Sequence, residues 1–274
     1  MGAPLLHILT RAMTLQDLVI APARRLPDVE VPRNLGYIGC VSYHYLHRLG
    51  RLETPGIRKI FIEVLPPYLF AGSNFQNALG VLTGFAELDL RGCADLENKI
   101  ERKRQVLETL HRTMQMLATE HGWDRGQLEH AQQGVVADNL QYVGSVFQKP
   151  MWNKSRTTKV DVKFTLDLDG IRAFVVVDDT SGNSRREIEL FQMGPNLGRL
   201  RDWISNVRWI GEHQIQISSN PTYNDLDEAN NVLLLGEAAP GDGYQYRLGP
   251  AVKYESVLSA DDEGRRIHRL TLTL

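Results

Sequence analysis

The clearest pattern along the chain is an alternation of apolar and polar residues between positions 159 and 168. The apolar residues stand at every second position, namely Val160, Val162, Phe164, Leu166 and Leu168. A period of two is typical of a strand with one buried face. Asp169-Gly170 then suits the two central positions of a type I′ turn, where both residues take positive φ. A second turn at 180–184 leads into 186–191, so the pattern predicts three consecutive antiparallel strands.

Further strands are predicted on both sides of this meander from runs rich in β-branched and aromatic residues. They are 37–46, 58–65, 81–90, 142–147, 207–217 with a break at Gly211-Glu212, 232–235, 244–258 and 267–274. Residues 150–155 and 220–231 are polar and predict loops. Gly194-Pro195-Asn196 predicts the start of a helix that carries Leu197, Leu200 and Ile204 on one side.

Between positions 95 and 121 the spacing of apolar residues changes to three and four, which predicts one long amphipathic helix. The apolar stripe comprises Leu96, Ile100, Leu107, Leu110, Met114 and Leu117, and only Lys103 interrupts it. Asp95 is a suitable N-cap and Gly122 a suitable left-handed stop. Asp124, with Gln127 three residues later, predicts the start of a second helix. We expect this helical hairpin to cover one face of the first sheet.

These elements predict an α+β fold, with antiparallel pairing throughout and a C-terminal half that is mainly β-meander. The chain divides into an N-terminal arm (1–34), formed by a short helix and an extended segment, an α+β region (35–140), and a mainly antiparallel β region with one helix (141–274). The sequence is also compatible with one continuous domain. It also leaves open whether translation starts at Met1 or at Met13.

Composition narrows the possible partners. The 274 residues include 31 Lys and Arg against 33 Asp and Glu, a balance that does not favour binding to nucleic acid. The apolar runs are too short to cross a bilayer, so no membrane association is expected. Cys40 and Cys93 are predicted to be buried thiols in a cytoplasmic protein. No cofactor is expected, and the oligomeric state is left open.

Catalytic chemistry has few candidates, because the chain contains no recognisable catalytic, metal or nucleotide motif. His44 is the best placed general base, with Tyr43 or Glu63 beside it in a pocket over the first sheet. His44 and His47 would share a face in a helix, but they point in opposite directions in the strand predicted here. His111, His121 and His130 lack the spacing of a metal motif, so no metal site is expected.

Other residues favour binding to another protein. Lys99, Arg102, Lys103 and Arg104 crowd the first half of the long helix, where positive charge opposes the helix dipole. Trp123 and Trp152 stand in polar connections, and tryptophan is enriched at interface hot spots. We expect a non-catalytic protein that binds a partner through a sheet face or the basic side of this helix. The build is similar to that of bacterial interaction proteins, including immunity proteins that cover the site of a toxin. The alternative is a small-ligand-binding protein or an enzyme that uses His44.

Overall fold

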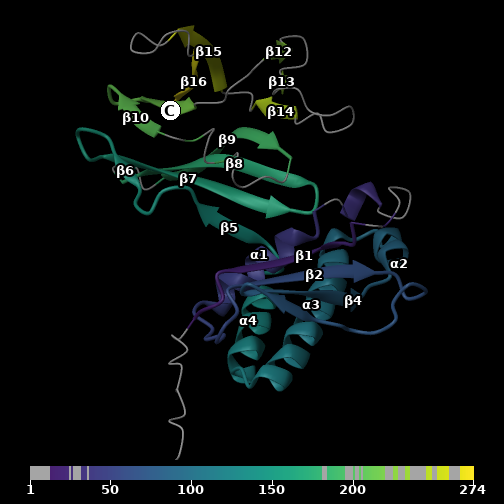
Figure 1. Cartoon of the computed structure of the whole chain (residues 1–274). Coiled ribbons are helices and arrows are strands. Elements are labelled where there is room, and N and C mark those ends of the chain that lie inside the picture. The colour runs from purple at the N-terminus through teal and green to yellow at the C-terminus, as the bar shows by residue number, and fades with distance from the viewer. Residues whose placement is uncertain are drawn as a thin grey trace, which may run out of the picture. The chain divides into compact units, whose positions relative to one another are not determined.

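The computed structural model describes most of the chain and divides it into two compact units, Met1–Tyr142 (unit 1) and Val143–Leu274 (unit 2). The described residues are 13–24, 26, 32–35, 37–180, 184–194, 200, 204, 206–219, 225–227, 232–234, 245–248, 252–258 and 266–274. The predicted α+β class is confirmed, since helices, antiparallel sheets and a C-terminal meander are all present (Figure 1).

Unit 1 contains a four-stranded sheet in the order β1-β2-β4-β3. Its strands are β1 (Asp17–Pro22), β2 (Lys59–Leu65), β3 (Gln76–Ala78) and β4 (Val81–Glu87). β1, β2 and β4 run parallel, and only β3 is antiparallel to its neighbour. The prediction of antiparallel pairing throughout is therefore wrong here. Residues 17–22 belong to the sheet rather than to an extended arm, and Pro22 is tolerated because β1 is an edge strand.

The segment predicted as a strand at 37–46 is instead helix α1 (Gly39–Leu49). Its buried residues include Val41, Tyr45 and Leu49, which are spaced by four and share one helical face. The Tyr- and Val-rich composition favoured a strand, but burial along this face outweighs that local preference. α1 also supplies the crossover that the parallel pair β1 and β2 requires.

The long helix begins later than predicted. A short helix α2 (Leu90–Asp95) precedes α3 (Lys99–His121), and Asn98 caps α3 by accepting a hydrogen bond from the Ile100 N–H at 2.8 Å. Gly122 ends α3 with φ of 71°, as predicted. Asp124 caps α4 (Arg125–Ala137) by accepting from the Gln127 N–H at 3.1 Å, which confirms the second helix.

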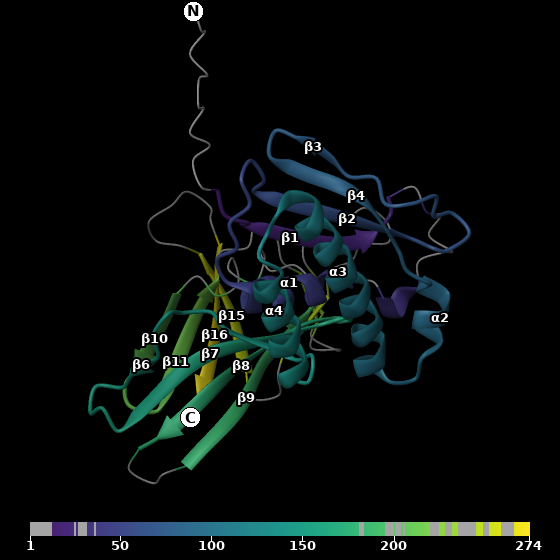
Figure 2. The same cartoon turned by 90° about the horizontal axis from the view of Figure 1, so that it is seen from below.

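The helices of unit 1 lie on one face of its sheet, as Figure 2 shows. Strand β2 alternates accordingly, with Ile60, Ile62 and Val64 buried and Phe61, Glu63 and Leu65 half-buried. The buried set and the half-buried set point to opposite faces. Among the described residues, no helix is both long enough and apolar enough to cross a membrane.

Unit 2 is built from two sheets. The larger has the order β12-β13-β14-β9-β8-β7-β5, with β6 also paired to β7, and the smaller has the order β10-β11-β16-β15. The strands of the larger sheet are β5 (Tyr142–Ser145), which starts at the last residue of unit 1, β6 (Met151–Trp152), β7 (Thr158–Asp167), β8 (Gly170–Asp179), β9 (Ser184–Met193), β12 (Asp225–Asp227), β13 (Val232–Leu234) and β14 (Gln245–Leu248). Those of the smaller are β10 (Asn206–Ile210), β11 (Gln214–Ser219), β15 (Val252–Leu258) and β16 (Arg266–Thr273).

The predicted meander is β7, β8 and β9, and its alternating apolar residues are buried. The turn between β7 and β8 differs from the prediction: Leu168 and Asp169 are its central residues, neither has positive φ, and Gly170 opens β8. The type I′ assignment is therefore wrong. Gly170 is required for another reason, because a Cβ on it would lie 2.2 Å from the Met193 carbonyl oxygen.

Two segments predicted as loops contain short strands, β6 within 150–155 and β12 within 220–231. These strands could not be predicted from their polar side chains, because such short strands are held by backbone hydrogen bonds, which any residue type can make. The break at Gly211 is confirmed as the turn between β10 and β11. The turn at 181–183 and most of the helix predicted after Gly194 lie outside the described residues.

Candidate functional site

The catalytic candidates of the sequence lie on α1, where helical geometry brings together residues that a strand would separate. Tyr43, His44 and His47 all contact the ring of Tyr142, with ring centroids 5.0, 5.4 and 5.2 Å away. Each meets the Tyr142 ring at a steep angle, which is a favourable arrangement for aromatic pairs. The expectation that His44 and His47 point in opposite directions is therefore wrong.

Asp138 joins this aromatic cluster to the end of α4. Its Oδ2 lies 2.8 Å from His44 Nε2 and accepts from Arg48 Nε at 2.6 Å, while its Oδ1 accepts from Arg48 Nη2. Asp138 is also the C-cap residue of α4, and its own N–H donates to the Gly134 carbonyl at 3.1 Å. We call His44, Arg48 and Asp138 the Asp138 clamp. It ties α1 to the C-terminal end of α4.

The charges within the clamp stabilise its own hydrogen bonds. Burial lowers the pKa of His44 below its ordinary value, although the hydrogen bond and negative charge of Asp138 act in the opposite direction. Burial alone would raise the pKa of Asp138, but hydrogen bonds from Arg48 and His44 outweigh it, so that pKa falls. At neutral pH the ring is neutral and the carboxylate ionised, so His44 Nε2–H donates to Asp138.

A general base needs a face open to substrate, and His44 does not have one. Only 3% of the residue is exposed, its Nε2 is engaged by Asp138, and its ring packs against Tyr142. Glu63 belongs to the half-buried set of β2, which faces away from the helices, and no hydrogen bond or ion pair joins it to His44 in the described part of the chain. Tyr43 contacts Tyr142 rather than completing a catalytic pair. The clamp is a structural element.

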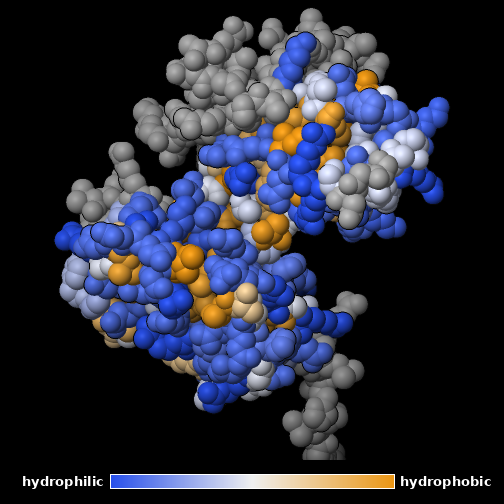
Figure 3. Space-filling view, turned by 180° about the vertical axis from the view of Figure 1, so that it is seen from behind, coloured by the Kyte–Doolittle hydropathy of each residue, from blue (hydrophilic) through white to orange (hydrophobic). Residues whose placement is uncertain are grey.

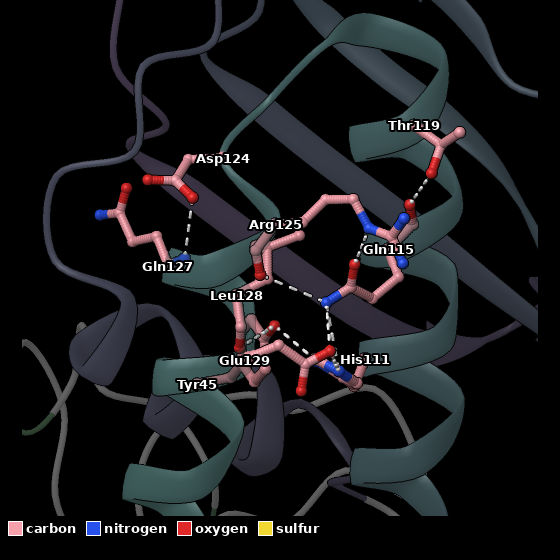
Figure 4. Close-up of polar contacts among 9 residues, drawn as sticks. All are labelled: Tyr45, His111, Gln115, Thr119, Asp124, Arg125, Gln127, Leu128 and Glu129. Atoms are coloured by element: carbon pink, nitrogen blue, oxygen red, sulfur yellow. Dashed lines mark hydrogen bonds and ion pairs between the residues drawn. The ribbon is translucent and has the colours of Figure 1, made fainter.

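A second polar network connects α1, α3 and α4 (Figure 4). The Tyr45 hydroxyl donates to the Leu128 carbonyl at 3.1 Å and lies 3.0 Å from His111 Nδ1. Because a hydroxyl has one hydrogen, His111 Nδ1–H is the donor in the second bond. Gln115 Nε2 donates to Glu129 Oε1 at 2.8 Å beside His111. His111 is therefore used in packing, and no group of three or more potential metal ligands gathers among the described residues.

The four basic residues in the first half of α3 have different surroundings. Lys103 is 4% exposed, and its Nζ donates to the Leu140 carbonyl at 2.9 Å. Arg102 turns back onto the Leu96 carbonyl at 2.7 Å, and Arg104 pairs with Glu101 at 2.9 Å. Lys99 is half-buried and also interacts with another group. The break in the apolar stripe at Lys103 was thus a sign of a buried amine rather than of an exposed positive face.

The two tryptophans have different surroundings. Trp123 is 6% exposed and stacks on His121 with ring centroids 5.1 Å apart, so it is part of the interior of unit 1. Trp152 in β6 is 43% exposed, and Lys159 Nζ lies over its ring at 5.8 Å. Of the six partner-binding residues predicted from the sequence, Trp152 best fits an exposed recognition surface.

Trp152 begins a row of four cross-strand neighbours on one face of the larger sheet of unit 2. The row runs Trp152, Lys159, Asp178 and Arg185 across β6, β7, β8 and β9. Lys159 Nζ lies 3.4 Å from Asp178 Oδ2, and Arg185 Nε lies 3.8 Å from Asp178 Oδ1. We call these residues the Trp152 row. Sequence reasoning missed the row, because its members are neighbours only in the register of the meander.

The turn that follows β6 holds Trp152 in place. Asn153 is buried, and its Oδ1 accepts from the N–H groups of Thr157 and Thr158 at 3.0 and 3.1 Å. Ser155 Oγ donates to Glu212 Oε2 in the β10–β11 turn at 2.7 Å. These bonds fix the backbone on the C-terminal side of Trp152.

The surface seen from behind is mainly hydrophilic, with apolar residues visible in patches on both units (Figure 3). In comparisons with protein-family models, curated proteins and solved structures, nothing matched the chain.

Proposed function

We propose that the protein is a non-catalytic binding protein that recognises another protein through the face of the larger sheet of unit 2, with the Trp152 row at its centre. The observation that carries this proposal is the exposed Trp152 ring at the end of a row of oriented charges. Tryptophan and arginine are the residues most enriched at interface hot spots, and both ends of the row carry one of them.

The Trp152 row carries charges of both signs, which favours selective binding of one partner over non-specific attraction of any acidic protein. Lys159 and Arg185 both approach Asp178, so the row has a surplus of one positive charge. Further along β7 and β8, Lys163 Nζ lies 3.6 Å from Asp161 Oδ2 and Arg172 Nε lies 2.7 Å from Glu189 Oε2, which continues a pattern of mixed sign. Mixed charge selects a partner with the complementary pattern and raises the cost of a wrong partner.

Rigidity supports the same proposal. Trp152 lies in a paired strand and is followed by a turn that Asn153 and Ser155 fix by side-chain hydrogen bonds. A side chain that is already ordered loses less conformational entropy when a partner covers it. The surface therefore needs little rearrangement for binding.

The proposal is tested by replacing Trp152 with alanine and measuring affinity for a partner identified by cross-linking to the wild-type protein. We expect Trp152→Ala to weaken binding by about 30-fold, corresponding to a hot-spot loss of about 2 kcal/mol. Arg185→Glu reverses the charge at the other end of the row and should also weaken binding. Ile210→Ala is the matched control, because Ile210 is 39% exposed but lies on β10 of the smaller sheet.

Equal affinity of the wild type and Trp152→Ala would contradict the proposal, as would a loss that Ile210→Ala reproduces. Because immunity proteins are among the binding proteins expected from the sequence, a toxin encoded beside the gene is the first partner to try. Quenching of tryptophan fluorescence by iodide, compared between the wild type and Trp152→Ala, gives a second measurement, since a bound partner should protect the exposed Trp152 ring.

A further inference from the structure

A half-open cavity of about 240 Å³ lies in unit 1, and it is independent of the function proposed for the Trp152 row. Its walls come from two segments that follow neighbouring parallel strands. Pro66, Pro67 and Tyr68 follow β2, and Asp89, Leu90 and Arg91 follow β4 and begin α2. Figure 1 shows α2 beyond the ends of these strands. The carboxyl ends of parallel strands are where open α/β sheets most often bind ligands.

The interior of the cavity is apolar. Pro66 and Leu90 are buried and form its floor, while Pro67 and Tyr68 are exposed at its edge. The volume corresponds to roughly eight water molecules at their share of the liquid, so the cavity has room for one small organic molecule. An apolar side chain of a ligand fits this floor and edge.

The polar groups of the cavity are two opposite charges that do not pair with each other. Arg91 is exposed and makes no hydrogen bond or ion pair within the described part of the chain. Asp89 Oδ1 accepts from the Gly92 N–H at 2.9 Å as the N-cap of α2, which leaves Oδ2 for a further donor. A ligand that satisfies both residues carries a carboxylate for Arg91 and an ammonium group for Asp89.

We propose that this cavity binds a free apolar α-amino acid. The ammonium group donates to Asp89, the carboxylate pairs with Arg91, and the side chain packs against Leu90, Pro66 and the Tyr68 ring. Because both charged residues are solvent-exposed, binding is weak, with a Kd on the order of 1 mM.

The test is calorimetric titration of the full chain with L-phenylalanine and L-leucine, in parallel with two blocked forms of phenylalanine. N-acetylphenylalanine lacks the ammonium group, and phenylalaninamide lacks the carboxylate. Each blocked form should bind about fivefold more weakly than free phenylalanine. This factor corresponds to about 1 kcal/mol, the upper end of what one exposed ion pair contributes. Equal binding of free and blocked forms would overturn the proposal and indicate a simple apolar or carboxylate site. The absence of saturable binding to both amino acids would overturn it as well.

Two variants assign the charges. Asp89→Asn keeps an N-cap acceptor for Gly92, so α2 remains capped while the negative charge is lost. This variant should bind phenylalanine and N-acetylphenylalanine equally. Arg91→Gln should bind phenylalanine and phenylalaninamide equally. Arg104→Gln is the matched control on α3 and should still prefer free phenylalanine to both blocked forms. If Asp89→Asn and Arg91→Gln also keep this preference, the cavity is not the binding site.

Discussion

The buried hydroxyl of Tyr45 gives a sharp test of how the helices of unit 1 are held together. Tyr45 is 0% exposed and its hydroxyl makes two hydrogen bonds, to the Leu128 carbonyl and from His111 Nδ1 (Figure 4). Tyr45→Phe removes both bonds and leaves the ring in place, so packing changes little. Each such bond contributes about 1 kcal/mol net, so the variant should be destabilised by about 2 kcal/mol.

Hydrogen exchange followed by mass spectrometry is the suitable assay, because the two units need not unfold together. Exchange of protected amides in α3 and α4 should accelerate by about 30-fold in Tyr45→Phe. Amides of β7 and β8 in unit 2 serve as the internal reference. Leu69→Ala is the control, since Leu69 is 47% exposed and a change there should have little effect. An acceleration below about threefold in α3 and α4 would refute the assignment of these two bonds as stabilising.

Two further predictions concern the Asp138 clamp and the β7–β8 turn. The folded-state pKa of His44 is lowered, so its contribution to stability is complete above about pH 6.5 and is lost as pH falls below that value. The variant His44→Gln can still donate a hydrogen bond to Asp138, but its side chain does not titrate. Between about pH 7 and pH 5, the free energy of unfolding measured in urea should therefore fall more steeply for the wild type than for His44→Gln. Parallel pH profiles of the two proteins would contradict this. Gly170→Ala places a Cβ 2.2 Å from the Met193 carbonyl oxygen at φ of 147°, so it should destabilise unit 2 by about 2 kcal/mol or more. Calorimetry measures this loss, and an unchanged melting temperature would mean that the β7–β8 turn shifts without cost.

The meander and the helical hairpin could be predicted from the sequence because both depend on local periodicity. Val160 to Leu168 alternate strictly, and Gly122 and Asp124 mark the junction between α3 and α4. α1 could not be predicted in the same way, because its Tyr and Val residues favour a strand while its buried positions repeat every four residues. The parallel pairing of β1 with β2 depends on this helix, so one wrong element also changed the predicted sheet.

The candidate sites were less predictable because they depend on tertiary contacts. Asp138 gave no signal in the sequence, yet it determines the environment of His44. Lys103 did give a signal by interrupting the apolar stripe, and its amine proves to bind the Leu140 carbonyl. Residues of like charge that are adjacent in sequence, such as Arg102 and Lys103, point to quite different partners in the folded chain.

The edge position of β1 has a practical consequence for work with shortened forms of the chain. β1 pairs with β2 from Asp17 opposite Lys59 to Pro22 opposite Val64. A truncation that begins after Pro22 would leave unpaired those backbone N–H and C=O groups of β2 that face β1, while the pairing of β2 with β4 would remain. Such an uncovered strand is a template for aggregation between copies. Fragments of unit 1 intended for expression should therefore retain Asp17 and the residues that follow it.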